Sequence, residues 1–203
     1  MGKCIIVAAG ENCGLDFVKD NDDYVIAADA GLKYLEEERI VPDMVVGDFD
    51  TLKYVPDHPN VIALKPEKDF TDTWEAVRQG RIKGYEEFHI YCGLGGRIEH
   101  SIANIQLLSD LASKGFKGYL YDKNSVLTCI HNGEMNFGPE KKGYISVFSL
   151  TDESYDVSIE GLKYQVSGYT LKSTFPLGVS NEFTGNASSV RVGEGILLLV
   201  YPR

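Results

Sequence analysis

Two aspartates that follow a short apolar stretch form a pair whose types and spacing could do chemistry. They belong to the segment Val45–Thr51, which reads VVGDFDT. If the apolar part is a buried strand, a period of two places Asp48 and Asp50 on the same side, at the carboxyl end where open α/β sheets bind ligands. Two carboxylates so close repel each other unless a cation, a proton or a basic side chain lies between them, and Mg²⁺ prefers oxygen ligands. The motif indicates a metal site, although two capping aspartates in a solvated turn fit the same letters.

Two more acidic motifs stand where a strand gives way to a helix. The segment Lys68–Asp72 reads KDFTD and has the form of a helix start, with Asp69 or Thr71 as the cap and Asp72 at the positive end of the helix dipole. Asp29 likewise separates an apolar run from a helical pattern. Either motif alone is explained by capping. Because such loops lie along one edge of a doubly wound sheet, their joint occurrence favours a shared site.

A glycine-rich loop opens the strongest helical pattern of the chain. The segment Tyr91–His100 reads YCGLGGRIEH, a strand running into glycines and Arg97. Glycines permit close backbone approach, a helix start presents N–H groups, and the guanidinium adds a forked donor, so the loop could hold a polyphosphate. It matches neither the Walker A pattern nor the GxGxxG spacing, and a tight strand-to-helix turn would need the same glycines.

The elements that position these motifs alternate along the first 125 residues or so. Apolar runs typical of buried strands alternate with amphipathic segments, which predicts a Rossmann-like, mostly parallel sheet with helices on both faces. The expected strands are Lys3–Ala9, Tyr24–Ala28, Met44–Val46, Val61–Leu64, Phe88–Tyr91 and Tyr119–Tyr121, and the expected helices are Gly31–Arg39, Thr71–Arg81 and Glu99–Lys114.

The pattern changes near Asn132-Gly133. Beyond it, β-branched and aromatic segments are separated by glycine turns, which predicts a small antiparallel sandwich or barrel. The expected strands are Tyr144–Leu150, Tyr155–Ile159, Tyr164–Val166, Ser188–Val192 and Ile196–Tyr201. We therefore expect an α/β domain over residues 1–132 and an all-β domain over residues 133–203.

Composition narrows the classes of function. The chain of 203 residues carries 20 basic and 30 acidic side chains, a net charge of −10, so we expect binding neither to nucleic acid nor to anionic membranes. Its longest apolar runs, such as Ile196–Tyr201, are far too short to span a bilayer. The four cysteines lie far apart and form no metal-binding pattern, so we expect reduced thiols and, without a secretory signal, a cytoplasmic protein.

In their order along the chain, these motifs resemble those of the thiamine pyrophosphokinase family. The resemblance rests on Asp29-Ala30-Gly31, Pro42-Asp43, Gly47–Thr51, Lys68–Asp72, Gly95–His100 with Asn104, and Ser180–Phe183. It implies an N-terminal α/β catalytic domain, a C-terminal β-sandwich and a homodimer with active sites at the subunit interface. The implied reaction is that of a transferase of thiamine diphosphate biosynthesis, in which ATP and thiamine give thiamine diphosphate and AMP.

The resemblance also suggests roles for individual residues. We expect Asp48, Asp50 and Asp72 to be catalytic and to hold Mg²⁺. The expected ATP-binding residues are Asp29, Lys68, Gly95, Gly96, Arg97 and His100, and the expected thiamine-binding residues are Asp72, Ser180 and Asn181. Three positions depart from the family pattern: Ala30 replaces a glycine, Thr51 a serine, and Glu99 the aspartate before histidine, so the role of Glu99 is open.

Two other functions fit parts of the sequence. The run Asp48–Leu52 resembles the nucleophile motif of haloacid dehalogenase-type phosphatases, but that motif normally follows the first strand of its domain and here two strands precede it. A non-catalytic nucleotide or thiamine sensor on the same fold would bind ligand without forming AMP.

Overall fold

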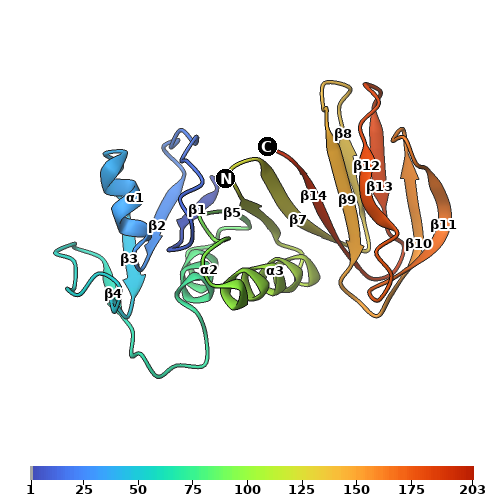
Figure 1. Ribbon diagram of the computed structural model, residues 1–203. Coiled ribbons are helices and arrows are strands. Elements are labelled where there is room, and N and C mark those ends of the chain that lie inside the picture. The colour runs from blue at the N-terminus through green and yellow to red at the C-terminus, as the bar shows by residue number, and fades with distance from the viewer. Residues whose placement is uncertain (1) are drawn as a thin grey trace. The chain divides into compact units, whose positions relative to one another are not determined.

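The structure, a computed structural model, describes residues 2–203 and forms two compact units, followed along the chain from blue to red in Figure 1. The first unit comprises the chain up to Leu107 together with Gly118–Lys123, and the second comprises Leu108–Lys117 and Asn124–Arg203. The domain boundary expected between residues 132 and 133 stays a prediction. Within residues 2–203, none of the helices combines the length and the apolar character that crossing a membrane requires.

The sheet of the first unit is mostly parallel, as predicted. Its strand order is β6-β5-β1-β2-β3-β4, and the pairs β1–β5, β1–β2, β2–β3 and β3–β4 all run parallel. The strands are β1 (Cys4–Val7), β2 (Tyr24–Ala28), β3 (Met44–Gly47), β4 (Val61–Ala63), β5 (Glu87–Tyr91) and β6 (Lys117–Tyr121). The parallel pairing brings the carboxyl ends of β1, β2, β3 and β5 to one edge.

Helices cover both faces of this sheet. On one face, Ile5 and Val7 of β1 share a buried cluster with Leu35 of α1 (Gly31–Glu37). On the other, Gly80 of α2 (Asp72–Ile82) packs so closely that an added Cβ would lie 2.7 Å from Cys4 Sγ. Since neighbouring strand residues point to opposite faces, the apolar run of β1 is buried on both sides. The third helix is α3 (Ile98–Ser113).

The strands of the second unit form two antiparallel groups, which confirms the antiparallel β prediction. Their strand orders are β12-β9-β14-β7 and β11-β10-β13-β8. The strands are β7 (Ser125–His131), β8 (Glu134–Phe137), β9 (Tyr144–Ser149), β10 (Glu153–Glu160), β11 (Val166–Lys172), β12 (Gly178–Glu182), β13 (Ser188–Arg191) and β14 (Ile196–Pro202). We did not expect β7, β8 or β12. The strand expected over Tyr164–Val166 starts only at Val166, because the Asn181 amide takes both the N–H and the C=O of Tyr164.

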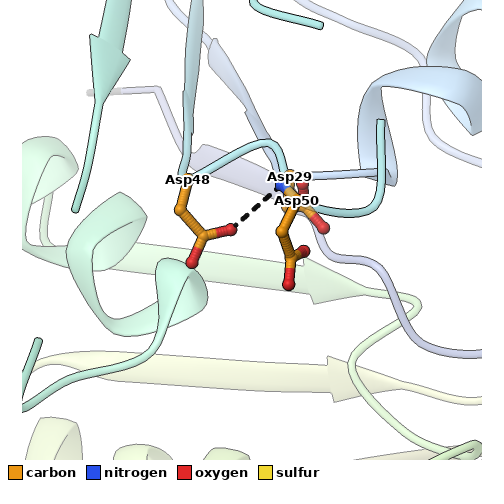
Figure 2. A group of neighbouring side chains, drawn as sticks. All are labelled: Asp29, Asp48 and Asp50. Carbon is orange, nitrogen blue, oxygen red and sulfur yellow. Dashed lines mark hydrogen bonds between the residues drawn. The ribbon is translucent and has the colours of Figure 1, made fainter. Parts of the chain in front are cut away.

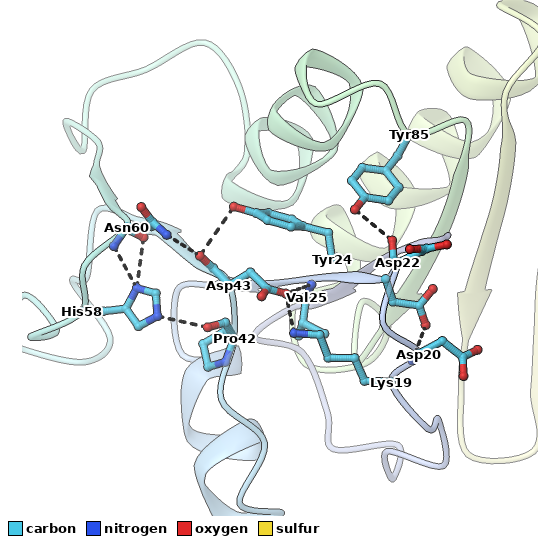
Figure 3. A network of polar contacts seen from close by, with 11 residues as sticks. Lys19, Asp20, Asp22, Tyr24, Val25, Pro42, Asp43, His58, Asn60 and Tyr85 are labelled. Carbon is cyan, nitrogen blue, oxygen red and sulfur yellow. Dashed lines mark hydrogen bonds and ion pairs between the residues drawn. The ribbon is translucent and has the colours of Figure 1, made fainter. Parts of the chain in front are cut away.

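Asp43 shows how a motif of the family resemblance serves the fold (Figure 3). One oxygen of its carboxylate accepts hydrogen bonds from the Val25 N–H and from Lys19 Nζ, both at 2.7 Å. Its carbonyl accepts from Asn60 Nδ2 at 2.9 Å, and His58 contacts the carbonyl oxygens of Pro42 and Asn60. Asp43 therefore secures the starts of β2 and β3, at the opposite end of these strands from the acidic motifs.

A buried carboxylate stabilises α2. Glu75 is 1% exposed and accepts three hydrogen bonds of 2.7 Å, two from Arg78 and one from Gln79. Burial opposes ionisation of Glu75, but the donors from Arg78 and Gln79 outweigh it and hold the pKa of the carboxyl below its ordinary value.

Replacing Glu75 with glutamine keeps the volume of the side chain and removes its charge. We expect the free energy of unfolding at pH 7 to fall by about 1–2 kcal/mol, since hydrogen bonds to charged groups contribute roughly 1.5–3 kcal/mol and Arg78 is half exposed. Because the folded pKa is lowered, this stabilisation is complete above the unfolded pKa, near 4.5, and is lost as the pH falls through the folded pKa. Urea unfolding at pH 7 and about pH 3, with exposed Glu36→Gln as the control, measures the difference. Equal midpoints for Glu75→Gln and wild type at pH 7 would contradict the assignment.

Candidate active site

The strand ends of the first unit surround a cavity of about 820 Å³. All nine site residues that the sequence suggests in this unit line it: Asp29, Asp48, Asp50, Lys68, Asp72, Gly95, Gly96, Arg97 and His100. Segments that are far apart in the sequence therefore meet at one edge of the sheet.

Three carboxylates meet in this cavity (Figure 2). One oxygen from each of Asp29, Asp48 and Asp50 lies within 4.8 Å of the others. Asp29 is only 6% exposed, and its buried Oδ1 has no hydrogen-bond partner. We expected Asp29 among the ATP-binding residues; the structure groups it with the two predicted metal ligands.

Asp48 and Asp50 lie close together, as expected, but the backbone brings them together through a turn and not through the period-two geometry of a strand. Strand β3 ends at Gly47, and buried Phe49 adopts a left-handed conformation with a φ of 58°. The Asp50 N–H then donates to Asp48 Oδ1 at 3.3 Å, the dashed line in Figure 2. Gly47 permits the close approach of β2, since a Cβ there would lie 3.0 Å from the Asp29 Cα.

Lys68 joins two of the predicted catalytic acids. Its Nζ lies 2.6 Å from Asp48 Oδ2 and 3.0 Å from Asp72 Oδ1, and the second contact is an ion pair without hydrogen-bond geometry. Burial acts against the charged forms, but these contacts outweigh it, so the pKa of Asp48 is lowered and that of Lys68 is raised. Both groups are therefore charged at neutral pH.

Asp72 lies in a different environment from Asp48. It opens α2, where Thr71 is the cap and accepts from the Trp74 N–H at 3.1 Å, which decides between the two capping residues considered. Burial raises the pKa of Asp72 and, with the charges of Asp48 and Asp29, outweighs the opposing effect of Lys68. A carboxylate with a raised pKa is a stronger base. Its predicted role as a metal ligand stays a prediction.

The glycine loop lines the same cavity ahead of α3. Gly95 and Gly96 have φ values of 77° and 63°, in the left-handed region that favours glycine. Arg97 extends into solvent with 71% of its side chain exposed, and its guanidinium contacts His100 Nε2. Asn104 donates to the Gly93 carbonyl at 2.7 Å and secures the start of the loop.

The sequence interpretation missed Glu11. This residue follows β1 and lines the cavity, and its Oε1 accepts from the Gly96 N–H at 3.3 Å. A Cβ added at Gly95 would lie only 2.5 Å from the Cγ of Glu11. Its place in the sequence could have identified it, because Glu11 comes just after the first parallel strand. Asp29 and Asp48 are predicted as site residues from the same kind of position, an acid at the carboxyl end of a strand.

Ser180 and Asn181 belong to β12 in the second unit. Asn181 is buried and lines an apolar cavity of about 330 Å³ there, beside Tyr164 and Tyr169. Its amide bonds to the Tyr164 backbone, while exposed Ser180 has a φ of 58°. Their contact with thiamine stays a prediction.

The donor set in the first unit fits a hard divalent cation. Asp29, Asp48 and Asp50 offer only carboxylate oxygens, and Asp29 Oδ1 is buried without a donor to satisfy it. Mg²⁺ takes such oxygen ligands and would remove the repulsion among the three charges.

Comparison with known families gives two matches that together span most of the chain. Residues 15–120 match the family model of the catalytic domain of thiamin pyrophosphokinase, and residues 133–197 match that of its vitamin B1 binding domain. The curated thiamine pyrophosphokinase of Bacillus subtilis (strain 168) is 27% identical over 205 residues, which cover 96% of each chain.

Solved structures agree with these matches. The crystal structure of thiamine pyrophosphokinase from Bacillus subtilis superposes with a TM-score of 0.88 at 25% identity, covering 100% of this chain and 99% of that one. The yeast thiamin pyrophosphokinase structure gives a TM-score of 0.76 at 15% identity, with 100% and 86% covered, and supports the fold alone. The family resemblance drawn from the sequence is confirmed, and the matches do not favour the phosphatase or sensor alternatives.

The carboxylate cluster predicts cation binding without any nucleotide. We expect Asp29→Asn to weaken Mn²⁺ binding at least about tenfold, because it removes a charged ligand oxygen from a buried position. Titration of Mn²⁺ followed by water proton relaxation measures the affinity. Asp69→Asn is the matched control, an exposed aspartate of the neighbouring loop that does not line the cavity. Equal affinities for Asp29→Asn and wild type would remove Asp29 from the cation site.

Proposed function

The chain belongs to the thiamin pyrophosphokinase family, and we propose that the cavity of its first unit transfers the diphosphate group of ATP to the hydroxyl of thiamine. The products are thiamine diphosphate and AMP. The observation that supports this most strongly is a single cavity that combines three clustered carboxylates with a lysine, an arginine and a glycine loop.

The acidic side of the cavity would hold the metal. Asp29, Asp48 and Asp50 supply the oxygens, with Asp72 as a further candidate ligand. When bound, Mg²⁺ would neutralise charge on the phosphate oxygens of ATP. Lys68 already offsets the charges of Asp48 and Asp72, so it keeps the acids from repelling an anionic nucleotide.

The glycine loop would hold the polyphosphate. The N–H groups of Gly95 and Gly96 and the exposed guanidinium of Arg97 are donors suited to phosphate oxygens. The guanidinium can only donate, so His100 Nε2 accepts from it and orients Arg97. In this structure the Gly96 N–H donates to Glu11 Oε1. This hydrogen bond must break before the same N–H can donate to a phosphate oxygen.

The transfer itself requires positioning and one proton acceptor. The thiamine hydroxyl oxygen forms a bond to the β-phosphorus of ATP, the bond from that phosphorus to the bridging α-phosphate oxygen breaks, and AMP leaves. We assign the hydroxyl proton to Asp72, whose raised pKa makes it a better base than Asp48. Asp50 is the alternative acceptor.

The second unit would recognise thiamine through Ser180 and Asn181. The thiazolium is cationic, so the net charge of −10 favours its approach as well as that of a metal ion.

The same net charge disfavours nucleic acid and anionic membranes as partners. We place the enzyme in the cytoplasm, where ATP is available.

We further propose a homodimer with active sites at the subunit interface. The second unit exposes large apolar side chains on its surface, among them Tyr144, Tyr164, Phe175, Leu177 and Val179, each at least 44% exposed. Such a surface is typical of a protein–protein interface.

Kinetics of an Asp48 variant test the catalytic assignment. Asp48→Asn keeps the side-chain volume and removes a charge, so we expect a folded protein whose kcat falls at least about a hundredfold. Formation of AMP at saturating Mg²⁺ measures it, with Asp69→Asn as the control. Near-wild-type turnover would contradict the role of Asp48.

Oligomeric state tests the interface. We expect a mass twice the 22.5 kDa of the chain by light scattering, and a shift towards monomer for Leu177→Glu, because a charge in an apolar interface is costly. Val18→Glu is the control, since Val18 is 80% exposed in the first unit. A wild-type monomer with full activity would contradict the dimeric site.

A further inference from the structure

Cys13 and Cys92 meet in the interior of the first unit although 79 positions separate them. Their sulfur atoms lie 3.4 Å apart. Each sulfur accepts a backbone N–H from the other residue, Cys92 N–H to Cys13 Sγ at 3.2 Å and Cys13 N–H to Cys92 Sγ at 3.4 Å. No spacing along the chain indicates this pair, because neither cysteine has another cysteine close to it in the sequence.

The geometry of this pair, and not its exposure, suits disulfide formation. All four cysteines are buried, and the Cys13 S–H also contacts the Gly14 carbonyl at 3.6 Å. What distinguishes Cys13 and Cys92 is that their sulfurs lie 3.4 Å apart. A disulfide holds its sulfurs at about 2.05 Å, so only a small movement separates the two thiols from bond formation. Cys4 and Cys129 are equally buried, and burial raises the pKa of each to about 12.

The two cysteines lie in loops that both line the ATP cavity proposed above. Cys92 directly precedes Gly93, and Cys13 directly follows Asn12, and both neighbours line that cavity. Backbone hydrogen bonds already join the two loops, Gly10 N–H to the Cys92 carbonyl at 2.8 Å and Glu11 N–H to the Leu94 carbonyl at 2.9 Å. A shift at the sulfurs therefore reaches the amides that would contact phosphate.

We propose that Cys13 and Cys92 are a peroxide-sensitive thiol pair whose disulfide ties these two loops together and weakens ATP binding. Cys13, which is 7% exposed while Cys92 is 0% exposed, meets the oxidant first. Its thiol loses a proton, and the thiolate attacks one oxygen of a hydroperoxide. The O–O bond breaks, and the hydroxide or alkoxide that leaves takes up a proton to become water or an alcohol, giving a sulfenic acid. The Cys92 thiol then attacks that sulfur, the S–O bond breaks, and the hydroxyl leaves with the thiol proton as water. The sulfurs lose two electrons in total, and the peroxide is reduced.

The formation of the bond is tested on the full chain with hydrogen peroxide. We expect the intact mass to fall by about 2 Da and a digest to contain one linked peptide pair joining Cys13 to Cys92, both reversed by dithiothreitol. Cys13→Ser should abolish the linkage, whereas a Cys4→Ser, Cys129→Ser double variant should retain it. Linkage through Cys4 or Cys129, or oxidation of Cys13 without linkage, would overturn the proposal.

The effect on ATP rests on the proposed function and is measured separately. We expect the oxidised protein to bind a fluorescent ATP analogue at least about fivefold more weakly, with recovery on reduction, because the loops that hold the phosphate have shifted. Unchanged binding after complete linkage would overturn the regulatory part. If the chain fails to form thiamine diphosphate at all, the mass measurement still decides whether the thiol pair exists, so the two failures are distinguishable.

Discussion

Repulsion among three clustered carboxylates, one buried, one half-buried and one exposed, is the constraint around which the first unit is organised. Oxygens of Asp29, Asp48 and Asp50 lie within 4.8 Å of one another, and at that distance two unit charges repel by about 3.5 kcal/mol at an effective dielectric constant of 20. Lys68 offsets part of this charge through Asp48 and Asp72, but Asp29 Oδ1 has no donor. A cation would remove the remaining repulsion, and in the proposed function the acidity of the chain would serve to hold a metal ion together with an anionic nucleotide.

The parallel sheet holds these charges in place through turns at the ends of its strands. Asp29, Phe49 and Cys92 each follow a strand directly or within two residues, and all three have positive φ values. Such conformations cost of order 1–3 kcal/mol in residues other than glycine and are maintained only by surrounding structure. Here that structure includes the buried strands β2, β3 and β5 and the cluster in which Phe49 packs. The strained backbone conformations therefore occur at the strand ends beside the cavity.

The sequence predicts the fold class and the cavity residues well because both depend on local patterns. Buried apolar runs reveal the strands of the first unit, whereas β8 and β12 are short and largely polar and give no such signal. Strand-end acids, glycines and Arg97, together with the family resemblance, identify nine residues of one cavity, but not which acids approach most closely. The pairing of Asp29 with Asp48, and of Cys13 with Cys92, depends on neighbouring strands and turns, which no spacing along the chain encodes.

One chromatogram tests the central claim most directly. The purified protein is incubated with Mg²⁺, ATP and thiamine, and the products are separated and quantified. Diphosphate transfer predicts AMP and thiamine diphosphate in equal amounts, with neither product formed when Mg²⁺ is replaced by a chelator. ADP with thiamine monophosphate, inorganic phosphate from ATP, or saturable binding without any AMP would contradict the account.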